Sequence, residues 1–188
     1  EVNRDNTGLK QTDVDIVIVH QHQRHNATGK KWQDIDRKHL DQTDEATIAT
    51  DVGQHQMWVA QAYPLRRSRQ WLTSGGLGTM GFGLPTAIGA SLAEPERTVV
   101  CFSGDGSILM NIQEFASAAE ENVNVKVVLM NNSSLGLVYQ QQNLFYGERT
   151  FSSKFKGVPD FITVAKGFGW QTVDLDQFAD PRAPLAAA

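Results

Sequence analysis

Continuous runs of apolar residues mark the first structural elements along this chain. Residues 14–19, 98–103 and 125–130 form such runs, and all three are rich in valine. Strands that helices cover on both faces have this composition, because neither face meets water. The pattern predicts buried strands at 98–103 and 125–130, and a buried strand or the remnant of one at 14–19. Residues 46–50 add a shorter strand.

Segments of a different pattern lie between and after these runs and predict helices. Residues 84–93 are mostly small, which allows a helix to pack its backbone closely against a sheet. Residues 108–121 carry apolar side chains at helical spacing, so an amphipathic helix is expected there. A further helix is predicted over residues 159–168, followed by a strand near 172–175.

The order of these elements predicts the fold class. Strand, helix and strand alternate from residue 46 onward, and glycine or polar residues follow the strands. This order is typical of a doubly wound α/β sheet, mostly parallel, with helices on both faces. Before residue 46 the chain is polar, so residues 1–45 are expected to be part strand and part loop or disordered segment.

Composition narrows the function classes. The 188 residues are 40% hydrophobic and 20% charged, which predicts a soluble globular protein with a core. The net charge of −4 and the lack of a dominant basic patch argue against nucleic acid or a membrane surface as partner. No apolar stretch reaches the roughly 18 residues of a membrane span. The single cysteine, Cys101, excludes an internal disulfide, so a cytoplasmic location is the expectation.

Candidate chemistry lies where two neighbouring strands end. Gly104-Asp105-Gly106 follows one buried strand, and Asn132 follows the next. Parallel strands bring these side chains to the same edge, where a carboxylate, an amide oxygen and a nearby backbone carbonyl would suit Mg²⁺ or Ca²⁺. Gly106 and Ser107 open the following helix, whose N–H groups favour an anion. The pattern predicts a metal-bridged diphosphate, although Asp105 and Asn132 could also simply cap the helix and turn the chain.

The pairing of Gly104-Asp105-Gly106 with Asn131-Asn132 resembles the signature of thiamine-diphosphate enzymes. Three segments, TDVGQHQMW at 50–58, WLTSGGLGTMGFGLP at 71–85 and LMNNSSLGLV at 129–138, extend the resemblance to acetohydroxyacid synthase. The similarity covers about residues 46–178 and implies a thiamine-diphosphate-binding domain over 46–188. The metal ligands would be Asp105, Asn132 and the carbonyl of Ser134. The residues that the resemblance places at the cofactor are Gln54, His55, Gly78, Met80, Gly104, Asp105, Gly106, Ser107, Asn132, Gly136 and Leu137.

Two further positions acquire catalytic roles only through this resemblance. Met80 would lie beneath the cofactor and force its bent shape, and a flexible apolar side chain among glycines suits that position. Gln141 stands where many family members carry a tryptophan that contacts the second 2-ketoacid. The plain alternatives are that Met80 belongs to the core and that His55 is a helix-start or core histidine. Trp58 and Trp71 are expected to pack rather than react.

The resemblance implies an activity and a set of partners. The enzyme would decarboxylate pyruvate and join the product to a second 2-ketoacid, giving acetolactate or acetohydroxybutyrate for branched-chain amino-acid synthesis. It would use thiamine diphosphate, Mg²⁺ and FAD. The likeness also implies a homo-oligomer, in which a neighbouring subunit's pyrimidine-binding domain supplies the activating glutamate, and a small regulatory subunit. The chain lacks that domain and most of a flavin site, so we expect a fragment without the last strand of the fold.

Other interpretations stay open at this stage. A pyruvate oxidase or a 2-ketoacid decarboxylase would share the cofactor signature, and a non-catalytic cofactor-binding or assembly module would share the half-site. His20, His22 and His25 form a His-x-His-x-x-His pattern that could bind zinc or nickel. No acidic or cysteine partner is evident for it, so a polar loop is the prediction there.

Overall fold

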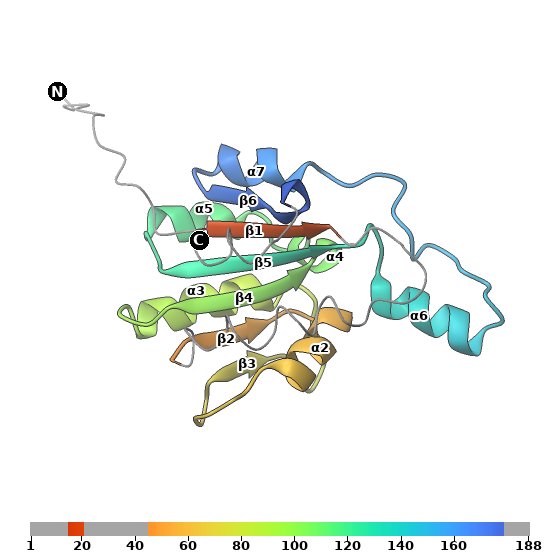
Figure 1. Ribbon diagram of the computed structural model, residues 1–188, viewed down its shortest axis with the longest axis horizontal. Helices are drawn as coiled ribbons and strands as arrows, with labels where there is room; N and C mark the ends of the chain where they lie inside the picture. Colours follow the sequence, from red (N-terminus) through yellow and green to blue (C-terminus); the bar gives the residue numbers. More distant parts are fainter. Residues whose placement is uncertain (1–14, 21–44, 179–188) are drawn as a thin grey trace.

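A six-stranded parallel sheet forms the centre of the computed structural model, which describes residues 15–20 and 45–178 (Figure 1). The strand order is β3-β2-β4-β5-β1-β6, and every pair of neighbours is parallel. This confirms the predicted α/β class. The strands are β1 (Asp15–His20), β2 (Thr47–Thr50), β3 (Trp71–Thr73), β4 (Val99–Gly104), β5 (Val125–Asn131) and β6 (Gln171–Asp174).

The apolar runs became strands because both faces of the sheet are covered. Along β4, Val99 and Cys101 belong to the larger core cluster, whereas Val100 and Phe102 pack on the other face. Such alternation follows from the pleat of a strand, whose successive side chains point to opposite faces. The predicted strands at 98–103 and 125–130 are thus confirmed, each shifted or extended by one residue at its carboxyl end.

Three helices cover the larger core face. They are α3 (Gly83–Ala93), α5 (Glu114–Glu120) and α7 (Phe161–Gly167), and each contributes fully buried side chains to one apolar cluster. In α3 the buried residues Leu84, Ala87, Ile88 and Ser91 recur at the spacing of one helix face. Phe115 of α5 meets the ring of Trp170 edge-on at 4.7 Å between centroids, which fixes α5 against the sheet.

The opposite face of the sheet is covered by α2 (Gln54–Ala62) and by a 3₁₀ turn at Leu175–Gln177. Helix α2 was not predicted, because its segment is polar and buries only His55 and Val59. Helix α6 (Gly136–Phe145) was missed for the same reason, since it buries no side chain fully. Figure 1 shows α6 projecting beyond the end of β5.

The helix predicted over 108–121 is wrong in its extent. The structure has a single helical turn, α4 (Asp105–Ile108), and then the separate α5, with turns between them. Ile108 and Phe115 are buried as the amphipathic pattern required, and Ile112 and Ala119 pack at the edge of the same cluster. The apolar pattern is therefore satisfied by two short elements, because turns can also bring residues to a common face.

The N-terminal strand lies inside the sheet rather than beside it. β1 pairs with β5 from Asp15↔Lys126 to His20↔Asn131 and with β6 on its other side. Ile16 and Ile18 are fully buried, so the prediction of a buried strand near 14–19 is confirmed. Residues 1–14, 21–44 and 179–188, and with them His22 and His25, lie outside the described residues, so the expectation that the chain stops before the last strand of the fold stays a prediction. Within the described residues, no helix is long and apolar enough to cross a membrane.

Candidate cofactor site

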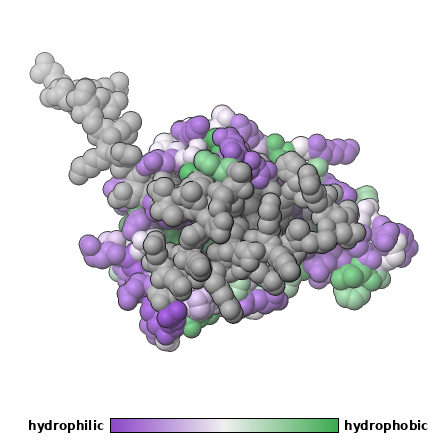
Figure 2. All heavy atoms as spheres, in the orientation of Figure 1, coloured by the Kyte–Doolittle hydropathy of each residue, from purple (hydrophilic) through white to green (hydrophobic). Residues whose placement is uncertain are grey.

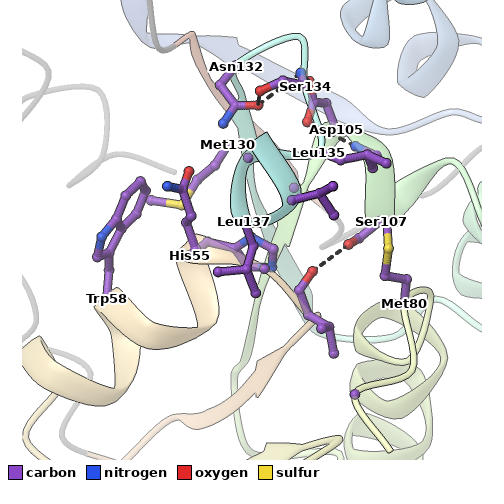
Figure 3. Close-up of a pocket in the computed structure, with 18 residues that line it drawn as sticks. His55, Trp58, Met80, Asp105, Ser107, Met130, Asn132, Ser134, Leu135 and Leu137 are labelled. Atoms are coloured by element: carbon purple, nitrogen blue, oxygen red, sulfur yellow. Dashed lines mark hydrogen bonds between the residues drawn. The ribbon is translucent and has the colours of Figure 1, made fainter. Parts of the chain in front are cut away.

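A pocket opens at the carboxyl ends of the parallel strands, where ligands bind in doubly wound folds (Figure 3). Its cavity measures about 160 Å³, and its walls come from the segments that follow β2, β4 and β5 and from the loop before α3. The residues that line it are Val52, Gly53, Gln54, His55, Trp58, Gly78, Met80, Gly104, Asp105, Gly106, Ser107, Met130, Asn132, Ser134, Leu135, Gly136, Leu137 and Val138.

The three predicted metal ligands come together at this edge. Asp105 directly follows β4 and is 2% exposed, while Asn132 and Ser134 follow β5. The Ser134 backbone N–H donates to Asp105 Oδ2 at 3.2 Å and to Asn132 Oδ1 at 3.1 Å, and the Ser134 hydroxyl donates to Asn132 Oδ1 at 3.0 Å. One carboxylate and one amide oxygen are thereby held side by side, as the strand pairing predicted.

The Asp105 carboxyl is in an environment that disfavours its charge. Burial raises its pKa above the usual value, and backbone N–H groups of residue 106 and of the 132–134 loop oppose that shift only in part. A divalent cation would supply the opposite charge that the carboxylate lacks. The described residues contain no cluster of three or more His, Cys, Asp or Glu side chains, so a metal here would depend on mixed carboxylate, amide and carbonyl ligands.

His55 supplies a second unusual group. The imidazole is 5% exposed, it lines the pocket, and its Nε2 is buried without a hydrogen-bond partner. Burial lowers the pKa of His55 to about 4, against the opposing effects of the Asp51 charge and of a hydrogen bond to the Asp51 backbone. A buried polar atom without a partner is uncommon in native proteins and is a position where a ligand can bind.

Glycines let these groups approach one another. A side chain at Gly104 would begin 3.1 Å from His55 Cε1, and one at Gly136 would begin 2.7 Å from Asn132 Nδ2. Gly78, with a φ of +66°, adopts a backbone conformation that residues with side chains rarely take. All three glycines were assigned to the cofactor by resemblance, and all three line the pocket.

The first turn after β4 differs from the sequence-based picture. α4 is only one turn long, and the Gly106 N–H, expected to be free for an anion, donates to Asp105 Oδ1 at 2.9 Å. The Ser107 hydroxyl donates to the Val52 carbonyl at 2.9 Å. In this structure the donor groups of both residues are therefore used in hydrogen bonds within the protein. The buried Asp105 carboxylate and the Val52 carbonyl take them, because buried acceptors need donors.

Met80 lies in the pocket wall beside α4. Its Cε would be 3.6 Å from a side chain at Gly106, and Figure 3 shows Met80 and Asn132 on opposite sides of the pocket. Gln54 also lines the pocket and donates from Nε2 to Gln140 Oε1 at 2.8 Å.

Gln141 is the one predicted site residue that does not line the pocket. It is exposed on α6, one residue beyond the partner of Gln54. Among lining residues that the sequence analysis did not assign, Trp58 was expected only to pack, and Val52, Met130 and Leu135 had no role. These residues lie directly beside the assigned motifs in the sequence, and that proximity could have indicated that they line the pocket.

The fold and the pocket together define the class of protein. It is a doubly wound α/β domain with a ligand pocket at the carboxyl edge of its parallel sheet, lined by one buried carboxylate and glycine-rich turns. Residues 51–188 match the family described as thiamine pyrophosphate enzyme, C-terminal TPP binding domain, and the chain belongs to that family. The resemblance found in its motifs is thereby confirmed.

Several relatives share long stretches of the sequence. The acetolactate synthase isozyme 1 large subunit of Escherichia coli (strain K12) is 64% identical over 142 residues, covering 76% of this chain and 25% of that protein. The acetolactate synthase large subunit of Lactococcus lactis is 53% identical over 132 residues, covering 70% and 23%. A probable acetolactate synthase large subunit of Methanococcus aeolicus is 52% identical over 122 residues, covering 65% and 20%. The chain thus spans about a quarter, or less, of these relatives' lengths.

Proposed function

We propose that this chain supplies the metal–diphosphate half of the active site of an acetohydroxyacid synthase, also called acetolactate synthase. The observation that carries the proposal is the pocket in which Asp105, Asn132 and Ser134 meet beside the unpartnered Nε2 of His55. The names of the three relatives given above, two acetolactate synthase large subunits and one probable one, support the choice of reaction within the family.

The donor set fits thiamine diphosphate and Mg²⁺. Asp105, the Asn132 amide oxygen and the Ser134 carbonyl would hold the cation, which prefers oxygen ligands. Only one of these ligands is charged, so the ion keeps positive charge for a diphosphate. His55 and Gln54 would bind diphosphate oxygens, because both side chains line the same wall as the metal ligands.

The organic part of the cofactor would lie toward Met80. A flexible thioether can follow an irregular ligand surface, and Gly78 lets the ligand approach the backbone there. When bound, thiamine diphosphate would supply the electron sink that decarboxylation of a 2-ketoacid requires. The described residues would bind and orient that group and shield it from water with the apolar side chains of Leu135, Leu137 and Val138.

The complete enzyme needs more than this chain. We propose that a pyrimidine-binding domain of a neighbouring subunit completes the site, that FAD binds largely outside these residues, and that a small regulatory subunit joins the assembly. The exposed apolar side chains near the end of α6 support a role in assembly (Figure 2): Leu144, Phe145 and Phe151 are 66%, 73% and 81% exposed. We place the cofactor-binding unit at residues 46–188 and the enzyme in the cytoplasm.

Titration calorimetry tests the proposal directly. Thiamine diphosphate should bind the purified chain with Mg²⁺ and much more weakly with a chelator present. Product analysis, with the chain joined to the remaining domains, then identifies the reaction. Acetolactate from pyruvate supports the proposal, whereas acetyl phosphate or acetaldehyde indicates an oxidase or a decarboxylase. Cofactor binding without turnover in the complete assembly would indicate a non-catalytic module.

A further inference from the structure

Asp51 is a buried carboxylate that the proposed function does not use. It follows β2 and is 1% exposed. Its Oδ1 accepts the backbone N–H groups of Val52 at 2.8 Å and Gly81 at 2.9 Å, and its Oδ2 accepts the N–H of Gly83 at 3.0 Å. A buried charge is costly unless it is hydrogen-bonded, and here two of the three bonds come from the loop that directly follows Met80.

Asn111 holds the same loop from its other side. Its Nδ2 donates to the Gly81 carbonyl at 2.6 Å, so both polar groups of Gly81 are bound by side chains. Asn111 comes from the turns between α4 and α5, and Asp51 comes from the end of β2. Two segments that are distant in sequence therefore both hydrogen-bond one glycine, the residue that follows Met80.

Gly81 and Gly83 must be glycines because Asp51 and Asn111 approach this loop closely. Gly81 has a φ of +86°, and a side chain there would begin 2.8 Å from Asn111 Nδ2 and from Met110 Cβ. A side chain at Gly83 would begin 2.9 Å from the Asp51 backbone nitrogen. Close approach to Asp51 and Asn111 explains both positions, whereas Gly78, the glycine of this run that the resemblance places at the cofactor, lines the pocket.

We infer that Asp51 and Asn111 are positioning residues that fix the Met80 turn, and through it the part of the pocket wall that Met80 forms across from Asn132. The inference rests on the proposed function only in that Met80 meets the organic part of the cofactor. The binding affinity for a ligand that reaches Met80 should therefore depend on Asp51 and Asn111. The affinity for a ligand that occupies only the metal–diphosphate end should not, because neither side chain has a hydrogen bond with Asp105 or Asn132 in the described structure. His55 at that end bonds the Asp51 backbone, which a side-chain substitution leaves in place, and its pKa of about 4 keeps the imidazole neutral near pH 7 with or without the Asp51 charge.

Asp51→Asn is the sharpest perturbation. The amide keeps one acceptor oxygen and nearly the same volume, but its NH₂ group must face a backbone N–H where a carboxylate oxygen stood. With Mg²⁺ present, the affinity for thiamine diphosphate should fall roughly 10- to 100-fold, the range expected for losing a hydrogen bond to a charged group. The affinity for inorganic diphosphate should stay within about twofold, which also shows that the variant is folded.

Two variants accompany it. Asn111→Ala should lower the affinity for thiamine diphosphate but not that for inorganic diphosphate, because it removes the hydrogen bond to the Gly81 carbonyl. Asp160→Asn is the matched control: Asp160 also accepts two backbone N–H groups, at 3.1 and 3.2 Å, but it caps α7 away from the pocket. Equal losses for both ligands in Asp51→Asn, or no loss for either, would overturn the inference.

Hydrogen exchange measured without any ligand separates this inference from the proposed function. A peptide covering residues 79–84 should exchange faster in Asp51→Asn than in the wild type, and Asp160→Asn should leave it unchanged. If the wild type bound neither thiamine diphosphate nor inorganic diphosphate, the proposed function would fail, and the exchange rates would still decide the positioning role. Unchanged exchange in Asp51→Asn would refute it.

Discussion

Replacing Asp105 by asparagine should have opposite effects on the free and the ligand-bound chain. Asp105 is the one carboxylate among the described residues that line the pocket. Burial raises its pKa, so the folded chain holds the proton more tightly than the unfolded chain. Stability from this group is therefore fully present below the unfolded pKa and is lost as the pH rises through the raised folded value.

Where Asp105 is ionised, the free wild-type chain carries the cost of that buried charge, and Asp105→Asn removes it. The asparagine keeps one acceptor oxygen for Gly106 or Ser134 and loses the other bond, which to a charged group is worth about 1.5–3 kcal/mol. The two effects oppose each other, so the unliganded melting temperature should change little.

The liganded state should behave differently. At a cofactor concentration a hundred times the Kd, binding stabilises the wild type by about 2.7 kcal/mol. For a chain of this length, 1 kcal/mol shifts the melting temperature by about 2–4 °C, which predicts a gain of roughly 5–11 °C with thiamine diphosphate and Mg²⁺. Asp105→Asn should lose nearly all of that gain, because the cation loses its charged ligand.

Differential scanning calorimetry at pH 7, with and without Mg²⁺, measures both effects. Asp160→Asn serves again as control and should keep the full Mg²⁺-dependent gain. An equal gain in Asp105→Asn would refute the metal-bridge assignment. A large loss of stability in the unliganded variant would instead show that the carboxylate is needed to hold the 132–134 loop.

Three further outcomes are expected. Gly136→Ala should abolish cofactor binding because its methyl group would collide with Asn132 and Gln54, whereas Gly89→Ala, a helix position with no heavy atom within 4 Å, should add about 0.5–1 kcal/mol of stability. The purified chain alone should turn pyruvate over negligibly, and steady acetolactate production would show that the activating group lies within it. In the complete enzyme, Gln141→Trp should raise the ratio of acetohydroxybutyrate to acetolactate by roughly 10- to 200-fold at most; an unmoved ratio would remove Gln141 from the acceptor pocket.

The central strands, and the meeting of Asp105 with Asn132 at one edge of the sheet, could be predicted from the sequence because they depend on local patterns. Continuous apolar runs are typical of strands buried on both faces, and β4 and β5 have that composition. Once both are parallel neighbours, Asp105 and Asn132 must reach the same edge. The short polar motifs that follow these strands carried the family resemblance, and the family match confirms it.

The helices α2 and α6 depended on tertiary structure. Neither has an apolar face that periodicity could reveal, since α2 buries only His55 and Val59 and α6 buries nothing fully. Position in the fold, rather than amphipathicity, determines both, because each follows a strand at the pocket edge. The break between α4 and α5 is a similar case, in which the apolar pattern of one long helix is met by two short ones.

Order within the sheet was also beyond the sequence. Valine and isoleucine in residues 15–20 predict a buried strand, but they do not say that it pairs between β5 and β6. The pairs that β1 forms join residues more than a hundred positions apart, and a local sequence pattern contains no information on which strand will be the partner.

Long-range contacts likewise decided the role of Asp51. In sequence it is an ordinary polar residue at the end of a strand; in the structure it binds Gly81 and Gly83, thirty or more residues away. The sequence by itself determined the fold class, the family motifs and which residues meet beside Asp105, because each depends on local patterning. Only the tertiary structure decided how the Met80 turn is held, because a buried carboxylate takes its partners from whichever backbone donors the fold brings within reach.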